Sequence, residues 1–112
     1  MALNDKRILF VCTANIDRSP TAEALLKGKE GFEVLSAGTW INAKRRISER
    51  LIDWADTIFV MEDNHKEDVI ALNPESENKI TVLGIPDIYL RDSPELVKKL
   101  KTKLIKYLDI KL

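Results

Sequence analysis

The stretch that decides the fold is Arg7-Ile8-Leu9-Phe10-Val11-Cys12-Thr13-Ala14-Asn15-Ile16-Asp17-Arg18-Ser19-Pro20. Residues 7–12 form a nearly continuous apolar run, which is typical of a central strand covered on both faces. Ser19 followed by Pro20 is typical of a helix start, with serine as the cap and proline at the first helical position. The stretch therefore predicts a strand, a short loop and a helix.

The rest of the chain repeats this alternation. Strands are predicted at residues 32–35, 57–61 and 80–83, because each is a short apolar run bounded by turn residues. The first helix is expected to end at Gly28. One further helix is capped by Ser48 and runs to Trp54, and another is capped by Asp63 and stops at Asn73-Pro74. Residues 39–46 and 86–92 are predicted to be loops.

The last helix begins at Ser93-Pro94 and carries an apolar stripe at helical spacing. The residues of this stripe are Leu96, Leu100, Leu104 and Leu108. Four strands interleaved with four helices predict an α/β three-layer sandwich, with a four-stranded parallel sheet flanked by helices. No repeat or linker interrupts the pattern, so we expect residues 1–112 to form a single domain.

Composition excludes several classes of function. The 18 basic and 18 acidic residues cancel, which argues against nucleic acid and a membrane surface as partners. No apolar run is long enough to span a bilayer, and residues 1–6 lack the layout of a signal peptide. A single cysteine excludes an intrachain disulfide and a thiolate zinc cluster, and we expect a cytoplasmic protein.

The loop between the first strand and the first helix has the spacing of an oxyanion cradle. Ligands of such sheets bind at the carboxyl ends of the strands, which is where Cys12 lies. The five residues between Cys12 and Arg18 are enough to curl backbone N–H groups around a tetrahedral anion at a helix N-terminus. Arg18 can bind two oxygens, and Ser19 and the helix dipole favour the Cys12 thiolate.

A lone cysteine at a strand end is often only a small buried hydrophobic residue. In that alternative Arg18 is a solvated side chain and Ser19 is merely a cap. The occurrence of arginine and serine at the required offsets favours a nucleophilic Cys12 instead.

These residues resemble the low-molecular-weight protein tyrosine phosphatases. The resemblance rests on Cys12-x5-Arg18-Ser19-Pro20 with Asn15 inside it, and on residues 22–24, 36–39, 55–61 and 87–89 in the same order. It covers most of the chain, which is short after Thr39 and looks like the compact branch of predicted phosphatases. The resemblance implies a cytoplasmic, cysteine-dependent phosphatase that hydrolyses phosphomonoesters through a phosphocysteine intermediate, without metal or cofactor.

The resemblance also implies roles and partners. Cys12 attacks phosphorus, Arg18 binds the equatorial oxygens, and Asp87, which follows the fourth strand, protonates the leaving group, with Asp92 as the fallback. The substrate-binding residues are Thr13, Ala14, Asn15, Ile16, Asp17, Ser19, Trp40 and Tyr89. Asn15 holds the loop, and Trp40 and Tyr89 wall the cleft, although packing is an equal alternative for Trp40. The substrate is a phosphotyrosine protein or a small aryl phosphoester, and inorganic phosphate or sulfate is expected in the loop.

Three departures from the family pattern affect this interpretation. Ala14 replaces a glycine, which matters if the position needs a positive φ. Asp17 replaces a second cysteine, so a carboxylate enters an anion loop and Cys12 has no thiol partner against over-oxidation. Ile88 replaces a proline in the acid loop.

Other hypotheses and residues are weaker. An arsenate reductase coupled to thioredoxin needs additional cysteines, and a phosphocysteine carrier does not need Arg18. The alternative outside enzymology is a non-catalytic anion-binding or partner-binding module, which Ala14 and Asp17 support. His65 is expected to be packed and hydrogen-bonded, and residues 44–46 to be a solvated basic loop.

Overall fold

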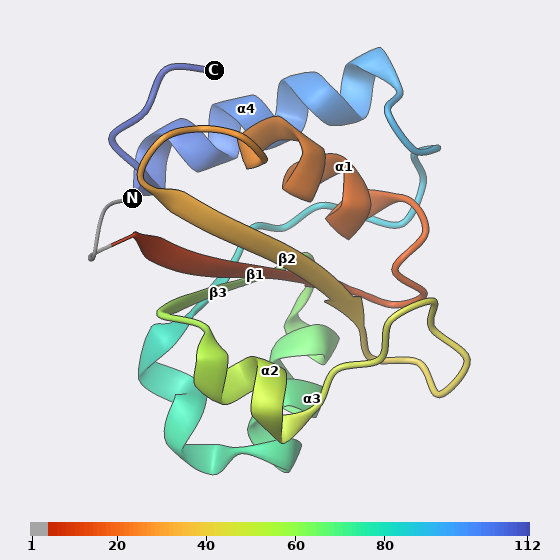
Figure 1. Ribbon diagram of the computed structural model, residues 1–112. Coiled ribbons are helices and arrows are strands. Elements are labelled where there is room, and N and C mark those ends of the chain that lie inside the picture. The colour runs from red at the N-terminus through yellow and green to blue at the C-terminus, as the bar shows by residue number, and fades with distance from the viewer. Residues whose placement is uncertain (1–4) are drawn as a thin grey trace.

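A parallel sheet in the order β2-β1-β3-β4 lies between two layers of helices in the computed structural model, which describes residues 5–112 (Figure 1). The strands are β1 (Lys6–Cys12), β2 (Phe32–Gly38), β3 (Thr57–Val60) and β4 (Ile80–Val82). Every strand pair is parallel, as right-handed βαβ crossovers produce. The predicted three-layer α/β fold is therefore confirmed.

Each face of the sheet is covered by its own pair of helices (Figure 1). Helices α1 (Arg18–Leu26) and α4 (Pro94–Tyr107) pack on one face, where the leucine stripe of α4 meets Ile8 and Phe10 of β1. Helices α2 (Glu49–Trp54) and α3 (Asp63–Leu72) cover the other face against Leu9 and Val11. A short 3₁₀ helix, Pro74–Lys79, follows α3 and was not predicted.

The order of the strands places the site. The chain leaves β1 toward β2 on one side and returns to β3 on the other, so the two crossovers diverge at the carboxyl end of β1. Such a switch point is where open α/β sheets bind ligands. Cys12 ends β1 there, paired with Gly38 at the end of β2.

Gly38 allows two loops to approach each other closely at this edge of the sheet. A Cβ atom on it would lie 2.4 Å from the carbonyl oxygen of Thr13 and 2.7 Å from the Cβ of Ala43. The absence of a side chain lets the loop at residues 39–46 fold back onto the loop after β1. Three backbone bonds then join the two loops, from the N–H groups of residues 39, 40 and 44 to the carbonyls of residues 12, 13 and 14.

Two predicted helix caps are wrong. Helix α1 begins at Arg18, with Asp17 in the cap position, and Ser19 lies inside the helix, where its hydroxyl contacts Cys12. Helix α3 is capped by Glu62 rather than Asp63, because Glu62 and His65 bond reciprocally in a capping box. Ser48 and Ser93 cap their helices as predicted.

The strand ends also differ slightly from the prediction. β2 continues to Gly38, whereas β3 and β4 each end one residue early. Helix and strand boundaries are commonly uncertain by a residue or two.

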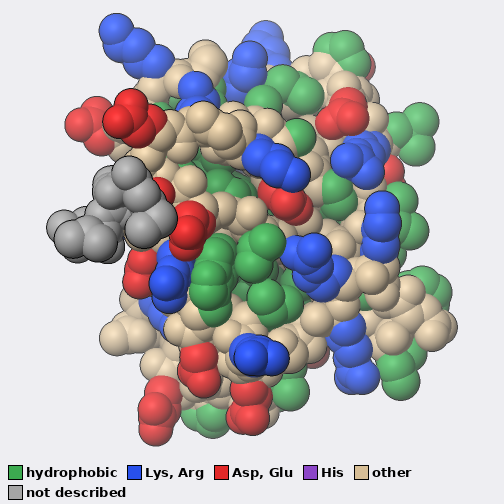
Figure 2. Space-filling view, in the orientation of Figure 1, with side chains coloured by type: hydrophobic (Ala, Val, Ile, Leu, Met, Phe, Trp, Pro, Cys, Tyr) green, Lys and Arg blue, Asp and Glu red, His purple; other side chains and the backbone are tan. Residues whose placement is uncertain are grey.

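Charged side chains of both signs are interspersed on the visible face, without a large area of one sign (Figure 2). Within residues 5–112, no helix is both long and apolar enough to cross a membrane. The expectation about a signal peptide concerns residues 1–6, of which 1–4 lie outside the described part of the chain.

We predict that Leu100→Ala lowers the free energy of unfolding by about 2–5 kcal/mol, because it opens a cavity in the core between α4 and the sheet. Urea unfolding followed by circular dichroism measures this. The matched control is Ile105→Ala on the same helix, where 51% of the side chain is exposed, and about 0.5 kcal/mol or less is expected. Equal losses in the two variants would show that the stripe is not the core contact described here.

Candidate active site

Residues from two segments far apart in the sequence line one small cavity of about 70 Å³ at the carboxyl edge of the sheet. The lining residues are Cys12, Thr13, Ala14, Ile16, Asp17, Arg18 and Asp87. The structure thus brings the three predicted catalytic side chains together, although Asp87 follows the last strand in the sequence and the other two lie at the end of the first strand and the start of α1. Within residues 5–112, no group of three His, Cys, Asp or Glu side chains is placed to hold a metal ion.

The sulfur of Cys12 is buried and contacts the hydroxyl of Ser19, with 2.9 Å between Sγ and Oγ. The side-chain amide of Asn15 donates to this hydroxyl and also to the hydroxyl of Ser36, each at 2.9 Å. Ser36 in turn donates to the carboxylate of Glu23. Sequence reasoning missed Ser36 and Glu23, which lie far from the nucleophile along the chain.

The direction of these bonds follows from donor counting. Asn15 supplies both hydrogens of its amide group, so Ser19 and Ser36 must accept. The proton of Ser36 then goes to Glu23, and the one proton of Ser19 has two neighbours, Cys12 Sγ at 2.9 Å and the carbonyl oxygen of Ala37 at 3.3 Å. The network therefore places the hydroxyl of Ser19 within hydrogen-bonding distance of the sulfur.

The positive φ of the loop falls on Asn15, at 58°, and not on Ala14. Asparagine tolerates the left-handed region better than most residues. The replacement of the family's glycine by Ala14 therefore introduces no backbone strain.

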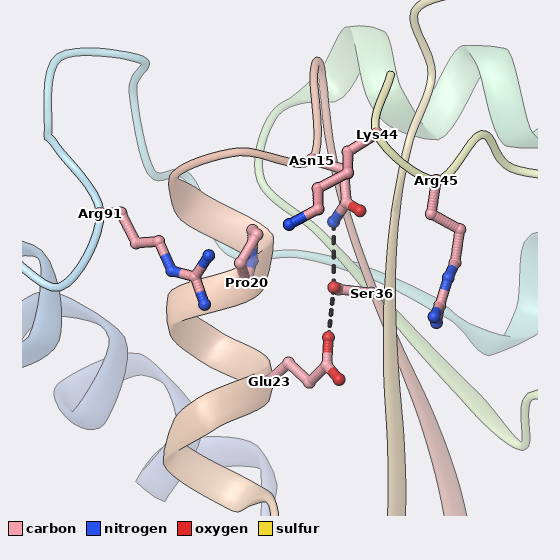
Figure 3. Close-up of a pocket in the computed structure, with 7 residues that line it drawn as sticks. All are labelled: Asn15, Pro20, Glu23, Ser36, Lys44, Arg45 and Arg91. Atoms are coloured by element: carbon pink, nitrogen blue, oxygen red, sulfur yellow. Dashed lines mark hydrogen bonds between the residues drawn. The ribbon is translucent and has the colours of Figure 1, made fainter.

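The network also faces a second cavity, of about 230 Å³, on its outer side (Figure 3). Asn15, Ser36 and Glu23 line it together with Pro20 and three basic side chains from two loops. Lys44 and Arg45 are exposed, as expected of a solvated basic loop.

Arg18 is almost completely buried, with 1% of its surface exposed. Its Nη1 donates to the carboxylate of Glu62 and, at 2.8 Å, to the carbonyl oxygen of Ile85. Its Nη2 donates to the hydroxyl of Thr13 at 3.3 Å, and its Nε lies 3.7 Å from the carboxylate of Asp87. Sequence reasoning missed Glu62, although an acidic residue just after the third strand lies at the same edge as Cys12.

The two acidic candidates of the 86–92 loop differ clearly. Asp87 lines the cavity, and 63% of its side chain is exposed. Asp92 has a φ of 61° and pairs with the side chain of Arg91, and its N–H donates to Thr21, so it is a turn residue.

Asp17 contacts this same loop. Its Oδ1 accepts a hydrogen bond of 2.9 Å from the backbone N–H of Arg91. Asp17, at the position of the family's second cysteine, therefore joins the loop between β1 and α1 to the loop at residues 86–92.

The structure places Trp40 and Tyr89 outside the wall of this cavity. Neither is among the residues that line the cavity with Cys12. Tyr89 is partly buried against the core. Trp40 is 51% exposed, and its backbone N–H donates to the carbonyl oxygen of Thr13. Ile16 and Ile88 also expose most of their surface around this edge.

His65 is fully buried and hydrogen-bonded through both ring nitrogens, so the packed role predicted for it is confirmed. Nδ1 accepts from the N–H of Glu62 at 3.0 Å, and Nε2 lies 2.8 Å from the hydroxyl of Thr13. Burial lowers the pKa of His65 from its ordinary value of 6.5, and the nearby Arg18 guanidinium lowers it further.

This lowered pKa predicts an acid-dependent loss of stability. In the unfolded chain the histidine binds a proton near its ordinary pKa, whereas the folded protein keeps it neutral to lower pH. Below about pH 6.5 the unfolded state therefore binds more protons, and the free energy of unfolding falls as the pH falls. Urea unfolding at a series of pH values, with wild type compared with His65→Gln, measures this component. Parallel profiles for the two proteins would contradict the assignment.

Comparisons with known proteins agree with this geometry. Residues 7–53 match the family described as low molecular weight phosphotyrosine protein phosphatase. A protein-arginine-phosphatase of Geobacillus stearothermophilus is 36% identical, and the match covers 69% of this chain and 68% of that protein. The chain belongs to the low molecular weight phosphotyrosine protein phosphatase family.

Other members of this family are similar to the chain. The low molecular weight protein-tyrosine-phosphatase Wzb of Escherichia coli (strain K12) is 33% identical, and the match covers 69% of each chain. The structure of Vibrio vulnificus Wzb in complex with benzylphosphonate has a TM-score of 0.75 at 25% identity and covers 91% of this chain and 96% of that one. Wzb of Escherichia coli K30 in complex with sulphate also has a TM-score of 0.75 at 25% identity, covering 91% and 95%.

Proposed function

We propose that this protein is a cysteine-dependent phosphatase that hydrolyses phosphomonoesters, with protein phosphotyrosine as the substrate. The observation that carries the proposal is the single cavity that Cys12, Arg18 and Asp87 line together at the N-terminus of α1. Membership of a phosphatase family supports the reaction class. No metal or cofactor is needed, because a thiolate, a guanidinium and a carboxyl group supply all the chemistry.

In the first step the Cys12 thiolate attacks phosphorus. A P–S bond forms, the ester P–O bond breaks, and the carboxyl proton of Asp87 passes to the leaving oxygen. The product on the protein is a phosphocysteine. Ser19 stabilises the thiolate before attack through its donated hydrogen bond.

In the second step water attacks the phosphocysteine. The Asp87 carboxylate removes a proton from this water as the new P–O bond forms, and the P–S bond breaks to restore the Cys12 thiolate. Inorganic phosphate leaves. One carboxyl group therefore acts first as acid and then as base, which its exposed position in the cavity wall permits.

Arg18 is oriented to bind two phosphoryl oxygens. Glu62 and Ile85 take both hydrogens of Nη1, and Thr13 takes one hydrogen of Nη2. The remaining donors are Nε–H and the second hydrogen of Nη2, which form the fork that binds oxyanions bidentately. The buried contacts thus aim the free edge of the guanidinium.

The loop is expected to hold inorganic phosphate or sulfate. Supporting this, similar proteins carry benzylphosphonate and sulphate in their structures. Local N–H groups and Arg18 must provide the affinity, because the net charge of the chain is zero. Phosphoarginine in proteins is a second candidate substrate, since one similar enzyme is a protein-arginine-phosphatase.

We place this activity in the cytoplasm and in one domain of residues 1–112. A free buried thiol as nucleophile suits a reducing compartment.

We predict that the wild type hydrolyses p-nitrophenyl phosphate and that Cys12→Ser lowers kcat/KM by about a thousandfold or more, because the nucleophile is lost. Asp87→Asn should lower kcat by about a hundredfold to ten-thousandfold, because the proton donor is lost. Asp92→Asn, on the same loop but outside the cavity, is the matched control and should stay near wild type. Activity that survives Cys12→Ser would overturn the mechanism.

The substrate is tested with paired peptides of one sequence that carry either phosphotyrosine or phosphoarginine. We predict the higher kcat/KM for phosphotyrosine, and the reverse order would favour the arginine assignment. A folded wild type that binds phosphate but turns over neither peptide nor p-nitrophenyl phosphate would favour the non-catalytic anion-binding module.

A further inference from the structure

We propose that the side-chain hydroxyl of Thr13 donates a hydrogen bond to the transferred phosphoryl group, and that His65 is the positioning residue that aims this hydroxyl. The inference rests on the proposed phosphatase function and adds to it one substrate contact and one supporting residue. It starts from the only histidine of the chain, which is buried against the anion loop and has no role in the two steps above.

The tautomer of His65 follows from its partner. The backbone N–H of Glu62 donates to Nδ1 at 3.0 Å, so Nδ1 carries no hydrogen. In the neutral ring the hydrogen is then on Nε2, and the bond of 2.8 Å to Thr13 runs from Nε2–H to the hydroxyl oxygen. The capping box at the start of α3 therefore fixes which nitrogen faces the loop.

Counting donors and acceptors then leaves one free proton on Thr13. A hydroxyl group has two acceptor positions and one donor. His65 fills one acceptor position, and Arg18 Nη2, at 3.3 Å, fills the other. Among the described residues no acceptor takes the hydroxyl proton of Thr13, which lines the cavity beside Cys12. A phosphoryl oxygen in this cavity is the acceptor that completes the set.

The surroundings keep His65 in the form that this arrangement needs. The charged groups that face the ring are Arg18 at the start of α1, Glu62 and Asp68 at the cap and within α3, and Asp87 after β4. Burial and Arg18 favour the neutral ring, against the opposite effect of the three carboxylates. Protonation would put a hydrogen on Nδ1 against the N–H of Glu62, so the two donors would repel and the ring would lose its fixed position.

The first test removes only the hydroxyl. Thr13→Val has nearly the same shape, and we expect kcat/KM for p-nitrophenyl phosphate to fall by about tenfold to a hundredfold, the range for a hydrogen bond to a charged group. Thr13→Ser keeps the hydroxyl and should restore most of the activity. A Thr13→Val variant with wild-type kcat/KM would overturn the proposed contact.

The second test removes the positioning group. His65→Leu eliminates the Nε2–H donor, whereas His65→Gln places an amide N–H at a similar reach. We expect the loss in His65→Leu to approach that in Thr13→Val, and His65→Gln to recover part of it. The double variant Thr13→Val/His65→Leu should lose little more than either single variant, because both changes remove one shared interaction. Additive losses would overturn the positioning role.

A readout independent of stability is the dependence of activity on pH. The wild type should show an acidic decrease in kcat/KM that follows the titration of His65, measured on the same protein by ¹⁵N nuclear magnetic resonance, which also reports the Nε2–H tautomer. Thr13→Val should lack that component. A Nδ1–H tautomer, or identical pH profiles for the two proteins, would overturn the proposal.

These variants distinguish failure of the proposed phosphatase function from failure of the proposed roles of Thr13 and His65. A folded wild type without phosphatase activity would reject the proposed function and this inference with it. An active wild type whose Thr13→Val and His65→Leu variants match it would reject the inference alone. Each variant is first shown to be folded by its urea unfolding curve, and Thr13→Val tests the bond even if His65→Leu does not fold.

Discussion

The arrangement of the site depends on the burial of one charge, the guanidinium of Arg18. A buried cation is strongly destabilising unless its hydrogens are paired. Here the partners come from three other segments: Thr13 after β1, Glu62 after β3 and Ile85 after β4. Satisfying this one side chain therefore brings the carboxyl ends of three strands to a common point. Among the described residues, Nε, which lies 3.7 Å from the carboxylate of Asp87, and one Nη2 hydrogen are then the donors of Arg18 without a hydrogen-bond partner.

A second buried network supports the other side of the loop. Asn15 links the hydroxyl beside Cys12 to Ser36 on β2, and Ser36 is oriented by Glu23 on α1. The loop between β1 and α1 is thus held by two sets of contacts. The neutral side chains of Ser19 and Asn15 lie near the sulfur, and the charged side chain of Glu62 binds Arg18. Thr13 contacts both Arg18 and His65, and because His65 lies on α3, this helix also supports the loop. In the proposed function, substrate affinity arises from these fixed dipoles and one cation, because the net charge of the chain is zero.

Local sequence patterns predict the layers of the fold and the position of the loop between Cys12 and Arg18. The apolar runs of β1 and β3 and the leucine stripe of α4 give the layers, and the spacing from Cys12 to Arg18 gives the loop. What escaped prediction depends on contacts between distant segments. Ser19 looks like a helix cap but is used by the sulfur, and Glu62 looks like a solvated acid but neutralises Arg18. Ser36 and Asp17 likewise acquire their roles only when β2 and the 86–92 loop each contact the loop that follows β1.

In the proposed mechanism, Cys12 carries the phosphoryl group between the two steps. The direct measurement is mass spectrometry of peptides from acid-quenched Asp87→Asn protein after mixing with p-nitrophenyl phosphate, since loss of the base slows hydrolysis of the intermediate. We predict one phosphoryl group on the peptide that contains Cys12, and none in Cys12→Ser. Steady turnover without any phosphorylated Cys12, or the phosphoryl group on another residue, would contradict it.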